Sequence, residues 1–198
     1  MKKINFKEPI VLENEIARLE PLGLNHVDEL FPVFIKYPDL HKYSPKLVRT
    51  RDDLVNYINI ASEAREKGQV YAFAIYDKRK NMYAGSTRYA NISEYHSGLE
   101  IGWTWLSEDF QGTGLNKNCK FLLLRNAFEN LQLERVGFRA DSRNEKSIRA
   151  MEKIGAIYEG KMRSHMKMRE GPRRDTVCFS ILQSEWTELR KNVFLNYE

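Results

Sequence analysis

Apolar and polar residues alternate in seven separate stretches of the chain. This period-two pattern is typical of β-strands that bury one face. The second and third stretches are joined by the short polar turn at 77–81, which predicts an antiparallel hairpin. The predicted strands cover residues 11–19, 70–76, 82–92, 99–106, 135–140, 156–168 and 176–182.

Between several of these strands, apolar residues recur every three or four positions, which is the spacing of a helix with one buried face. Ser142 and Glu145 have the spacing of a capping box and predict the start of one such helix. Glycines mark two of the expected ends, because they adopt the left-handed backbone that closes helices. The predicted helices begin at Val27, Asp52, Leu115, Ser142 and Ser184, and the second and fourth end at Gly68 and Gly155.

The order of these elements defines the fold class. The early strands pair antiparallel, whereas strand 99–106, helix 115–131 and strand 135–140 follow one another and imply a parallel crossover. The sequence therefore predicts an α+β fold with a mixed, mostly antiparallel central sheet of about seven strands flanked by helices. At 198 residues the chain is long enough for one core, and we expect a single domain over residues 1–198.

The composition excludes several classes of protein. No apolar run approaches the length of a membrane span, and residues 1–6 lack the apolar stretch of a signal peptide, so we expect no membrane partner and no export. Two cysteines, Cys119 and Cys178, are too few for a disulfide framework or a metal site. We therefore expect a cytoplasmic protein without a bound metal.

The net charge of +5 is unevenly distributed. Residues up to Phe110 carry 15 basic and 16 acidic side chains, whereas residues from Gln111 onward carry 17 and 11. The excess of basic residues after Phe110 suits a polyanionic ligand bound by this half of the chain, although a solvated basic face is the simpler interpretation. No RNA-binding or groove-reading signature accompanies it, so nucleic acid is not an expected partner.

One turn in that half is suited to phosphate. Strand 99–106 leads into Gln111-Gly112-Thr113-Gly114-Leu115-Asn116 and then directly into a helix. A glycine-containing turn at a helix start leaves backbone N–H groups unpaired, and with the helix dipole these favour an anion. The pattern fits neither a P-loop nor the dinucleotide fingerprint, and a turn without any ligand is the alternative.

A second segment narrows the reading: Asn144-Glu145-Lys146-Ser147 opens the helix that ends at Gly155. Together the two segments resemble the acetyl-CoA-binding core of the GCN5-related N-acetyltransferases (GNAT), with their Gln/Arg-x-x-Gly-x-Gly/Ala loop and Asn-x-x-Ser helix start. The resemblance covers roughly residues 11–186, and segments 99–106 and 174–182 look like the ribosomal-protein (Rim-type) N-terminal acetyltransferase branch. Asn116 departs from the motif, which has Gly or Ala there, and its side chain could either bond a phosphate or crowd it.

The resemblance implies the acyl-CoA N-acyltransferase fold and acetyl-CoA as the acetyl donor. It implies that the loop amides hold the pyrophosphate, that Asn144 holds the pantetheine arm, and that backbone N–H groups of 101–106 meet the oxyanion where this strand splays from its neighbour. Lys117, Lys120, Arg149 and Lys153 are the candidates for the outer phosphate. The cofactor-binding residues so implied are Ile101, Trp103, Thr104, Gln111, Gly112, Thr113, Gly114, Leu115, Asn116 and Asn144.

Glu100 and Ser147 are the catalytic residues that the resemblance implies. Strand alternation places Trp103 and Trp105 on one face, as core packing, and Glu100 on the other as a carboxylate in an apolar strand, a position that tends to raise a carboxyl pKa. Glu100 would take the amine proton, directly or through a water, and Ser147 would protonate the departing thiolate. A surface glutamate, a helix-start serine and a helix cap at Asn144 are the structural alternatives.

Other reactive side chains have simpler readings. Cys119 falls on the apolar face of its helix and is interpreted as an inert core thiol rather than a nucleophile. His165 and Tyr158 lie on a predicted strand near the acceptor side, where a solvated residue is more common than a substrate contact.

The sequence therefore predicts an acetyl-CoA-dependent N-acetyltransferase that transfers acetyl directly to a primary amine, either a protein N-terminus or a small molecule. The alternative is a catalytically silent acyl-CoA-binding or regulatory module. A homodimer through the last strand and helix is left open.

Overall fold

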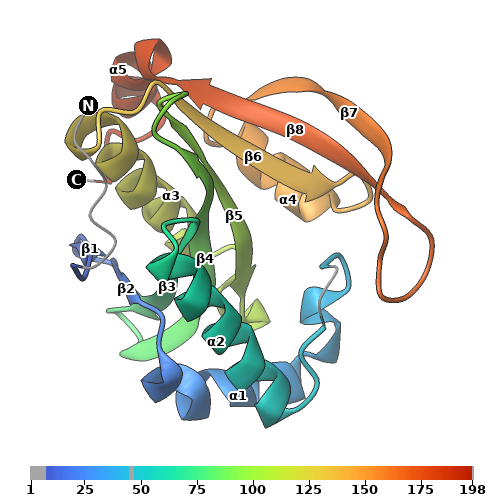
Figure 1. Ribbon diagram of the computed structural model, residues 1–198. Helices are drawn as coiled ribbons and strands as arrows, with labels where there is room; N and C mark the ends of the chain where they lie inside the picture. The colour runs from blue at the N-terminus through green and yellow to red at the C-terminus, as the bar shows by residue number, and fades with distance from the viewer. Residues whose placement is uncertain (1–7, 45–46, 198) are drawn as a thin grey trace.

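The computed structural model describes residues 8–44 and 47–197, and within these ranges one sheet of eight strands runs through the molecule (Figure 1). Its spatial order is β1-β2-β3-β4-β5-β6-β8-β7, in which only β5 and β6 pair in parallel. The mixed, mostly antiparallel α+β fold is confirmed. The strands are β1 (Leu12–Glu13), β2 (Ala17–Pro21), β3 (Val70–Asp77), β4 (Met82–Ser93), β5 (Gly98–Leu106), β6 (Arg135–Asp141), β7 (Ile157–Met166) and β8 (Arg174–Leu182).

Helices cover both faces of the sheet and enclose two apolar layers. Under α1 and α2 lies a smaller layer that includes Leu30, Ile58 and Trp105, and we call this side the α2 face. The opposite side, covered by α3, α4 and α5, carries the larger core, and we call it the α3 face. The helices are α1 (Val27–Lys36), α2 (Arg51–Glu66), α3 (Leu115–Arg125), α4 (Glu145–Glu152) and α5 (Gln183–Asn192), with short 3₁₀ turns at Leu24–His26, Pro38–His41 and Glu108–Phe110.

The prediction of one strand over 11–19 is wrong, because Asn14 interrupts it. The Asn14 side-chain oxygen accepts hydrogen bonds from the backbone N–H groups of Ile16 at 3.1 Å and Ala17 at 2.9 Å. An Asx turn of this kind reverses the chain, so β1 folds back antiparallel on β2. This hairpin accounts for the eighth strand.

The predicted capping box of Ser142 and Glu145 is also wrong. The N-cap of α4 is Asn144, whose side-chain oxygen accepts the backbone N–H of Ser147 at 3.1 Å. Ser142 instead belongs to a turn that ties the end of β6 to β8, donating its own N–H to the carbonyl of Asp175 at 2.9 Å. The cap is therefore an asparagine side chain two residues later than the predicted serine.

Strand β5 contains a bulge that overturns its predicted alternation. Arg88 of β4 faces Gly102 and Ser86 faces Trp105, so two residues of β5, Trp103 and Thr104, stand opposite one residue of β4. Trp103 takes a positive φ of 49° and is 46% exposed, which contradicts its placement in the core. The extra residue also moves Trp105 to the α2 face, because a shift of one position exchanges the two faces of a strand.

The long helix predicted over 115–131 divides into α3 and one turn of π-helix at Asn126–Asn130. A π-turn disturbs the regular carbonyl ladder, and the hydroxyl of Tyr89 on β4 donates to the carbonyl of Leu123 at 2.6 Å. The Asn126 side chain donates in turn to the Tyr89 oxygen at 3.3 Å. Tyr89 is 1% exposed, so this small network lies wholly inside the core.

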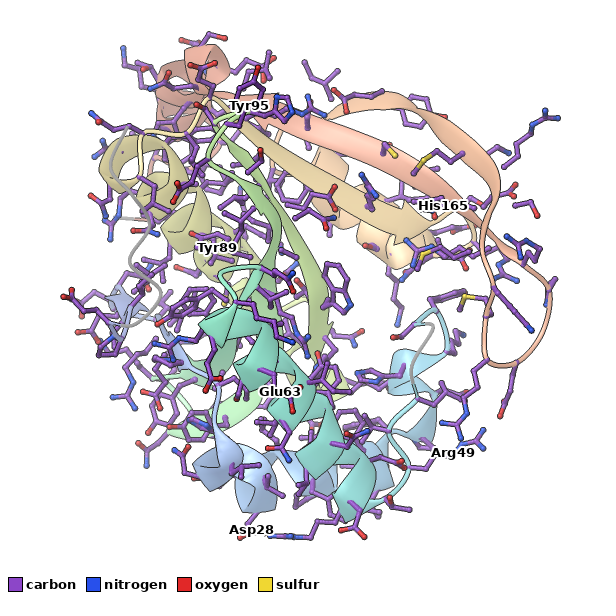
Figure 2. The ribbon with its side chains drawn as sticks, viewed as in Figure 1. Asp28, Arg49, Glu63, Tyr89, Tyr95 and His165 are labelled. Atoms are coloured by element: carbon purple, nitrogen blue, oxygen red, sulfur yellow. The ribbon has the colours of Figure 1, made fainter. Side chains whose placement is uncertain are left out.

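Replacing Tyr89 by phenylalanine is expected to destabilise the protein by about 1–3 kcal/mol, because it leaves the buried Asn126 amide without its acceptor and removes one of the donors to the buried Leu123 carbonyl. Denaturant unfolding of the variant measures this loss. Tyr95, at the β4–β5 turn, is 91% exposed and gives the matched control (Figure 2). Tyr95→Phe should change stability by less than about 0.5 kcal/mol, and equal effects of the two variants would contradict the network.

Candidate functional site

The loop before α3 presents unpaired backbone donors. Gly112 and Gly114 have φ of 75° and 85°, a left-handed backbone that other residues adopt with strain. Among the residues described, the N–H groups of Gly112, Thr113 and Gly114 donate no hydrogen bond. A Cβ built on either glycine would meet nothing within 4 Å, so the loop borders open space. The predicted phosphate-binding loop therefore has donors and room for an anion.

Hydrogen bonds to β5, to the 3₁₀ turn 108–110 and to α4 fix this loop. The Gln111 side chain donates a hydrogen bond to the carbonyl of Leu106 at 3.1 Å. Its amide oxygen accepts a hydrogen bond from the ammonium group of Lys146 at 3.3 Å. The Thr113 hydroxyl donates to the carbonyl of Phe110 at 2.7 Å. Lys146 links the loop to the first turn of α4 and adds positive charge there, a role that the sequence gave no signal for because the two segments lie 35 positions apart.

Asn116, where the family motif has Gly or Ala, lies in the first turn of α3. Its side-chain oxygen is buried and accepts no hydrogen bond. Amide oxygen and nitrogen exchange places by a half-turn of the side chain, so the same group can present a donor to an anionic ligand. Asn116, the one residue that departs from the family motif, therefore has a side-chain oxygen that no other group in the described chain uses.

The pairing of β5 with β6 is short. It comprises Gly98 with Arg135, Leu99 with Val136 and Glu100 with Gly137. Beyond these positions β6 stays paired with β8 and β5 with β4, and the two strands diverge, as Figure 1 shows. The backbone of β5 after Glu100 therefore has one edge that no neighbouring strand occupies, which is the splay that the resemblance implies.

The three predicted cofactor residues of β5 occupy different environments. Ile101 is 2% exposed and packs into the larger core, while Trp103 lies on the bulge at the surface. The Thr104 hydroxyl forms a hydrogen bond of 2.8 Å with the Thr87 hydroxyl. It also accepts a hydrogen bond of 2.9 Å from the ammonium group of Lys120. For Ile101 only the backbone is free to meet a ligand from this edge, whereas Thr104 is exposed with its hydroxyl already hydrogen-bonded.

Glu100 is the last residue of β5 that pairs with β6, and it stands at the point where the strands part. Its side chain is 16% exposed and forms an ion pair of 2.7 Å with Arg139, on β6. It lies over Gly137, where an added Cβ would come within 3.1 Å of the Glu100 Cγ. A mostly buried, arginine-paired carboxylate is not a solvated surface glutamate.

Ser147 and Asn144 lie at the start of α4. The cap uses the Asn144 oxygen, which bears out the capping alternative, and within the described chain its amide nitrogen donates no hydrogen bond. The Ser147 hydroxyl likewise has no hydrogen-bond partner among the residues described. The Asn144 amide nitrogen and the Ser147 hydroxyl therefore lie just after the end of β6, and both are free to bind a ligand.

The four basic candidates for an outer phosphate are unequal. Lys120 is 7% exposed and points inward to Thr104, so it is removed from that set. Burial lowers the pKa of Lys120 to about 8. Lys117 lies 4.9 Å over the Tyr197 ring and Arg149 pairs with Glu145 at 3.0 Å, whereas Lys153 is exposed at the end of α4.

Cys119 and His165 lie in surroundings that fit the non-catalytic interpretations given to them from the sequence. Cys119 is 1% exposed, and burial raises the pKa of its thiol to about 12, so the reactive thiolate is disfavoured. His165, labelled in Figure 2, forms a hydrogen bond of 3.0 Å with Thr176 on the adjacent strand. In the described part of the chain, neither side chain forms a hydrogen bond with the loop or with Glu100.

No metal or membrane feature accompanies this site in residues 8–44 and 47–197. These residues include no cluster of three or more His, Cys, Asp or Glu side chains arranged to hold a metal ion. They also include no helix with the length and apolar character needed to cross a bilayer.

Comparison with known proteins places the chain among acetyltransferases. The model of the acetyltransferase (GNAT) domain matches residues 17–157. The crystal structure of a GCN5-related N-acetyltransferase from Brucella melitensis superposes with a TM-score of 0.88 and 28% identity, covering 96% of this chain and 86% of that one.

Two curated relatives agree in class. The Bacillus subtilis (strain 168) protein named "Putative ribosomal N-acetyltransferase YdaF" is 36% identical over 96 residues, which are 48% of this chain and 51% of that protein. The match therefore spans about half the length of that relative. "Uncharacterized N-acetyltransferase p20" of Bacillus licheniformis is 25% identical over 155 residues, 78% of this chain and 83% of the relative.

The buried ammonium group of Lys120 should make the stability of the fold depend on pH. Its folded pKa of about 8 lies below the unfolded value of 10.5, so the charged form destabilises the fold below pH 8 and this cost is relieved as pH rises from 8 toward 10.5. Lys120→Met should therefore be more stable than the parent at pH 7, by up to about 3 kcal/mol. The advantage should shrink by pH 9.5, as measured by denaturant unfolding.

Lys191, exposed on α5, supplies the control substitution Lys191→Met. Its effect on unfolding should be small and should not change between pH 7 and pH 9.5. A pH-independent effect of Lys120→Met would refute a penalty from the buried charge.

Proposed function

Because the chain belongs to the acetyltransferase (GNAT) family, we propose that it transfers the acetyl group of acetyl-CoA to a primary amine, directly and within a ternary complex. The family and the enzyme class agree with the resemblance found in the sequence. The acceptor is a protein N-terminus or a small-molecule amine, and the Bacillus subtilis relative named for ribosomal N-acetylation supports the first of these.

The observation that carries the proposal is the position of Glu100 at the parting of β5 and β6, with the glycine loop at the far end of β5. A thioester lying along the free edge of β5 would have its phosphates at the amides of Gly112–Gly114 and its acetyl group near Glu100. This arrangement places donors at one end of the coenzyme and a carboxylate at the other. Gln111, Leu115, Asn116 and Asn144 complete the proposed coenzyme-binding set, together with the backbone of Ile101, Trp103 and Thr104.

In the proposed reaction the amine nitrogen attacks the thioester carbonyl and the carbon–sulfur bond breaks. Glu100 accepts the proton that the amine loses, directly or through a water, and the Ser147 hydroxyl donates a proton to the departing thiolate. Backbone N–H groups of β5 stabilise the oxyanion, since they are unpaired on the side facing the splay. The ion pair with Arg139 orients the Glu100 carboxylate toward that edge.

Several expectations complete this proposal. We propose one catalytic domain over the whole chain, a cytoplasmic location, and no nucleic-acid or membrane partner. A homodimer stays within the proposal, but strand pairing through β8 does not, because β6 and β7 occupy both edges of that strand. A silent acyl-CoA-binding module is the alternative, and the unpaired Ser147 hydroxyl and the mostly buried Glu100 favour the enzyme.

Acetyl-CoA and CoA should each raise the unfolding temperature, whereas ATP should not. At one hundred times its dissociation constant a ligand adds about 2.7 kcal/mol to stability, which a thermal-shift titration detects. Thiol release with a panel of amines and N-terminal peptides should then depend on the amine. Stabilisation without thiol release from any acceptor would favour the silent module, and absence of stabilisation would overturn the coenzyme assignment.

Glu100→Gln should preserve coenzyme binding and lower turnover on the order of 10²-fold, most severely at low pH where the amine is protonated and needs a base. Thiol release across a pH series measures this. Glu159→Gln is the matched control, because Glu159 also pairs with a β6 arginine, Arg135. Rates unchanged by Glu100→Gln at every pH would remove the residue's role as base.

A further inference from the structure

A buried arginine under α2 has no role in the proposed proton transfers. Arg88, in the middle of β4, is 6% exposed, and its guanidinium carbon lies 4.1 Å from the centre of the Tyr57 ring on α2. Its Nε and Nη2 atoms are buried without a hydrogen-bond partner, and within the described residues no carboxylate pairs with it. A buried charge without a counter-charge is strongly unfavourable, so the site is incomplete as it stands.

Several polar atoms in the same layer as Arg88 also lack hydrogen-bond partners. The Tyr57 hydroxyl, the Ser86 hydroxyl and the Trp105 indole nitrogen are also buried without partners, and all lie in the layer between α2 and the sheet. Guanidinium and indole groups only donate hydrogen bonds, and hydroxyl groups can donate. Buried polar groups in folded proteins are normally satisfied, so what this layer lacks is acceptor atoms and negative charge.

Open space lies beside these donors. Gly102 stands directly opposite Arg88 on β5, so the two residues share the α2 face. A Cβ built on Gly102 would meet nothing within 4 Å. Glu100 lies two positions earlier on the same face, because side chains alternate along a strand before the bulge. The space at Gly102 is therefore bordered by the proposed base and by the unpaired arginine.

We propose that this space is an acceptor subsite for a carboxylate, and that the substrate is a primary amine carrying one. The carboxylate accepts the hydrogen bonds of Arg88, and the amine lies toward Glu100. This inference rests on the proposed acetyl transfer and names its acceptor class. A polyamine would bring a second cation to a buried guanidinium, and this layer therefore disfavours it.

The spacing of the two anchors limits the size of the acceptor. Arg88 and Glu100 are diagonal neighbours across β4 and β5, a relation that separates backbone positions by about 7–8 Å. Both side chains leave the same face of the sheet, the Glu100 carboxylate toward Arg139 on β6 and the Arg88 guanidinium toward Tyr57 on α2. We therefore infer a small acceptor that reaches from one group to the other. Two sources supply this chemistry: a free α-amino acid, and a peptide whose first residue is acidic.

Calorimetric titration of protein saturated with CoA tests the subsite without requiring turnover. The probes are L-glutamate against L-glutamine amide, a tetrapeptide amide beginning with Asp against one beginning with Asn, and spermidine. The carboxylate member of at least one pair should bind roughly tenfold or more tightly than its uncharged partner, since charge-assisted bidentate pairs are strong. The first pair identifies a free amino acid and the second a peptide.

Arg88→Met should abolish that preference and leave binding of the uncharged probes unchanged, while Arg88→Lys should retain part of it. Arg65→Met is the matched control, because Arg65 also stacks on a tyrosine, Tyr71, at 4.4 Å. Arg88→Met should unfold at the same or a higher temperature than the parent, since it removes a buried unpaired charge. Lost binding in a variant of undiminished stability is not a folding defect.

Two results would overturn the subsite: equal binding of carboxylate and uncharged probes, or equal losses for both in Arg88→Met. Thiol release from acetyl-CoA with the same probes separates this inference from the proposed function. Arg88-dependent binding without thiol release would refute the transfer and keep the subsite. Thiol release without a carboxylate preference would refute the subsite alone.

Discussion

The short parallel pairing of β5 and β6 is the constraint on which the rest of the site depends. Three residue pairs join the strands, after which each takes its hydrogen bonds from its other neighbour. A longer pairing would occupy the backbone donors of β5 and close the edge at which we place the thioester. The bulge at Trp103 increases the local twist of β5 and so helps to turn it away from β6.

Charged groups gather around this bulge in an otherwise apolar core. Lys120 reaches Thr104 from the α3 face, while Arg88 and Glu100 lie on the α2 face. Burying each of these groups opposes folding, and such exceptions to an apolar interior are expected where a protein binds and reacts. The large core under α3, with Tyr89 and the π-turn at its centre, compensates for this cost.

Sequence patterns were sufficient for the fold because they depend on local periodicity. The hairpin of β3 and β4, the crossover through α3 and the glycine loop follow from spacing and turn chemistry. The errors have local causes that a regular pattern conceals: an Asx turn at Asn14, a cap at Asn144 and one extra residue at Trp103. Glu100 kept its predicted face because it precedes the bulge, whereas Trp105 exchanged faces because it follows.

Acceptor recognition was out of reach for the sequence for a different reason. Arg88 lies in a strand predicted only from its alternating pattern, and the packing of α2 over that face shows that its charge is buried. The significance of Gly102 is likewise spatial, because an absent side chain matters only when a donor stands opposite to it. Coenzyme binding depends on contiguous motifs, but acceptor choice arises between helices and strands that are distant in the chain. Family membership therefore supports the proposed donor, and the proposed acceptor rests on the geometry of the α2 face.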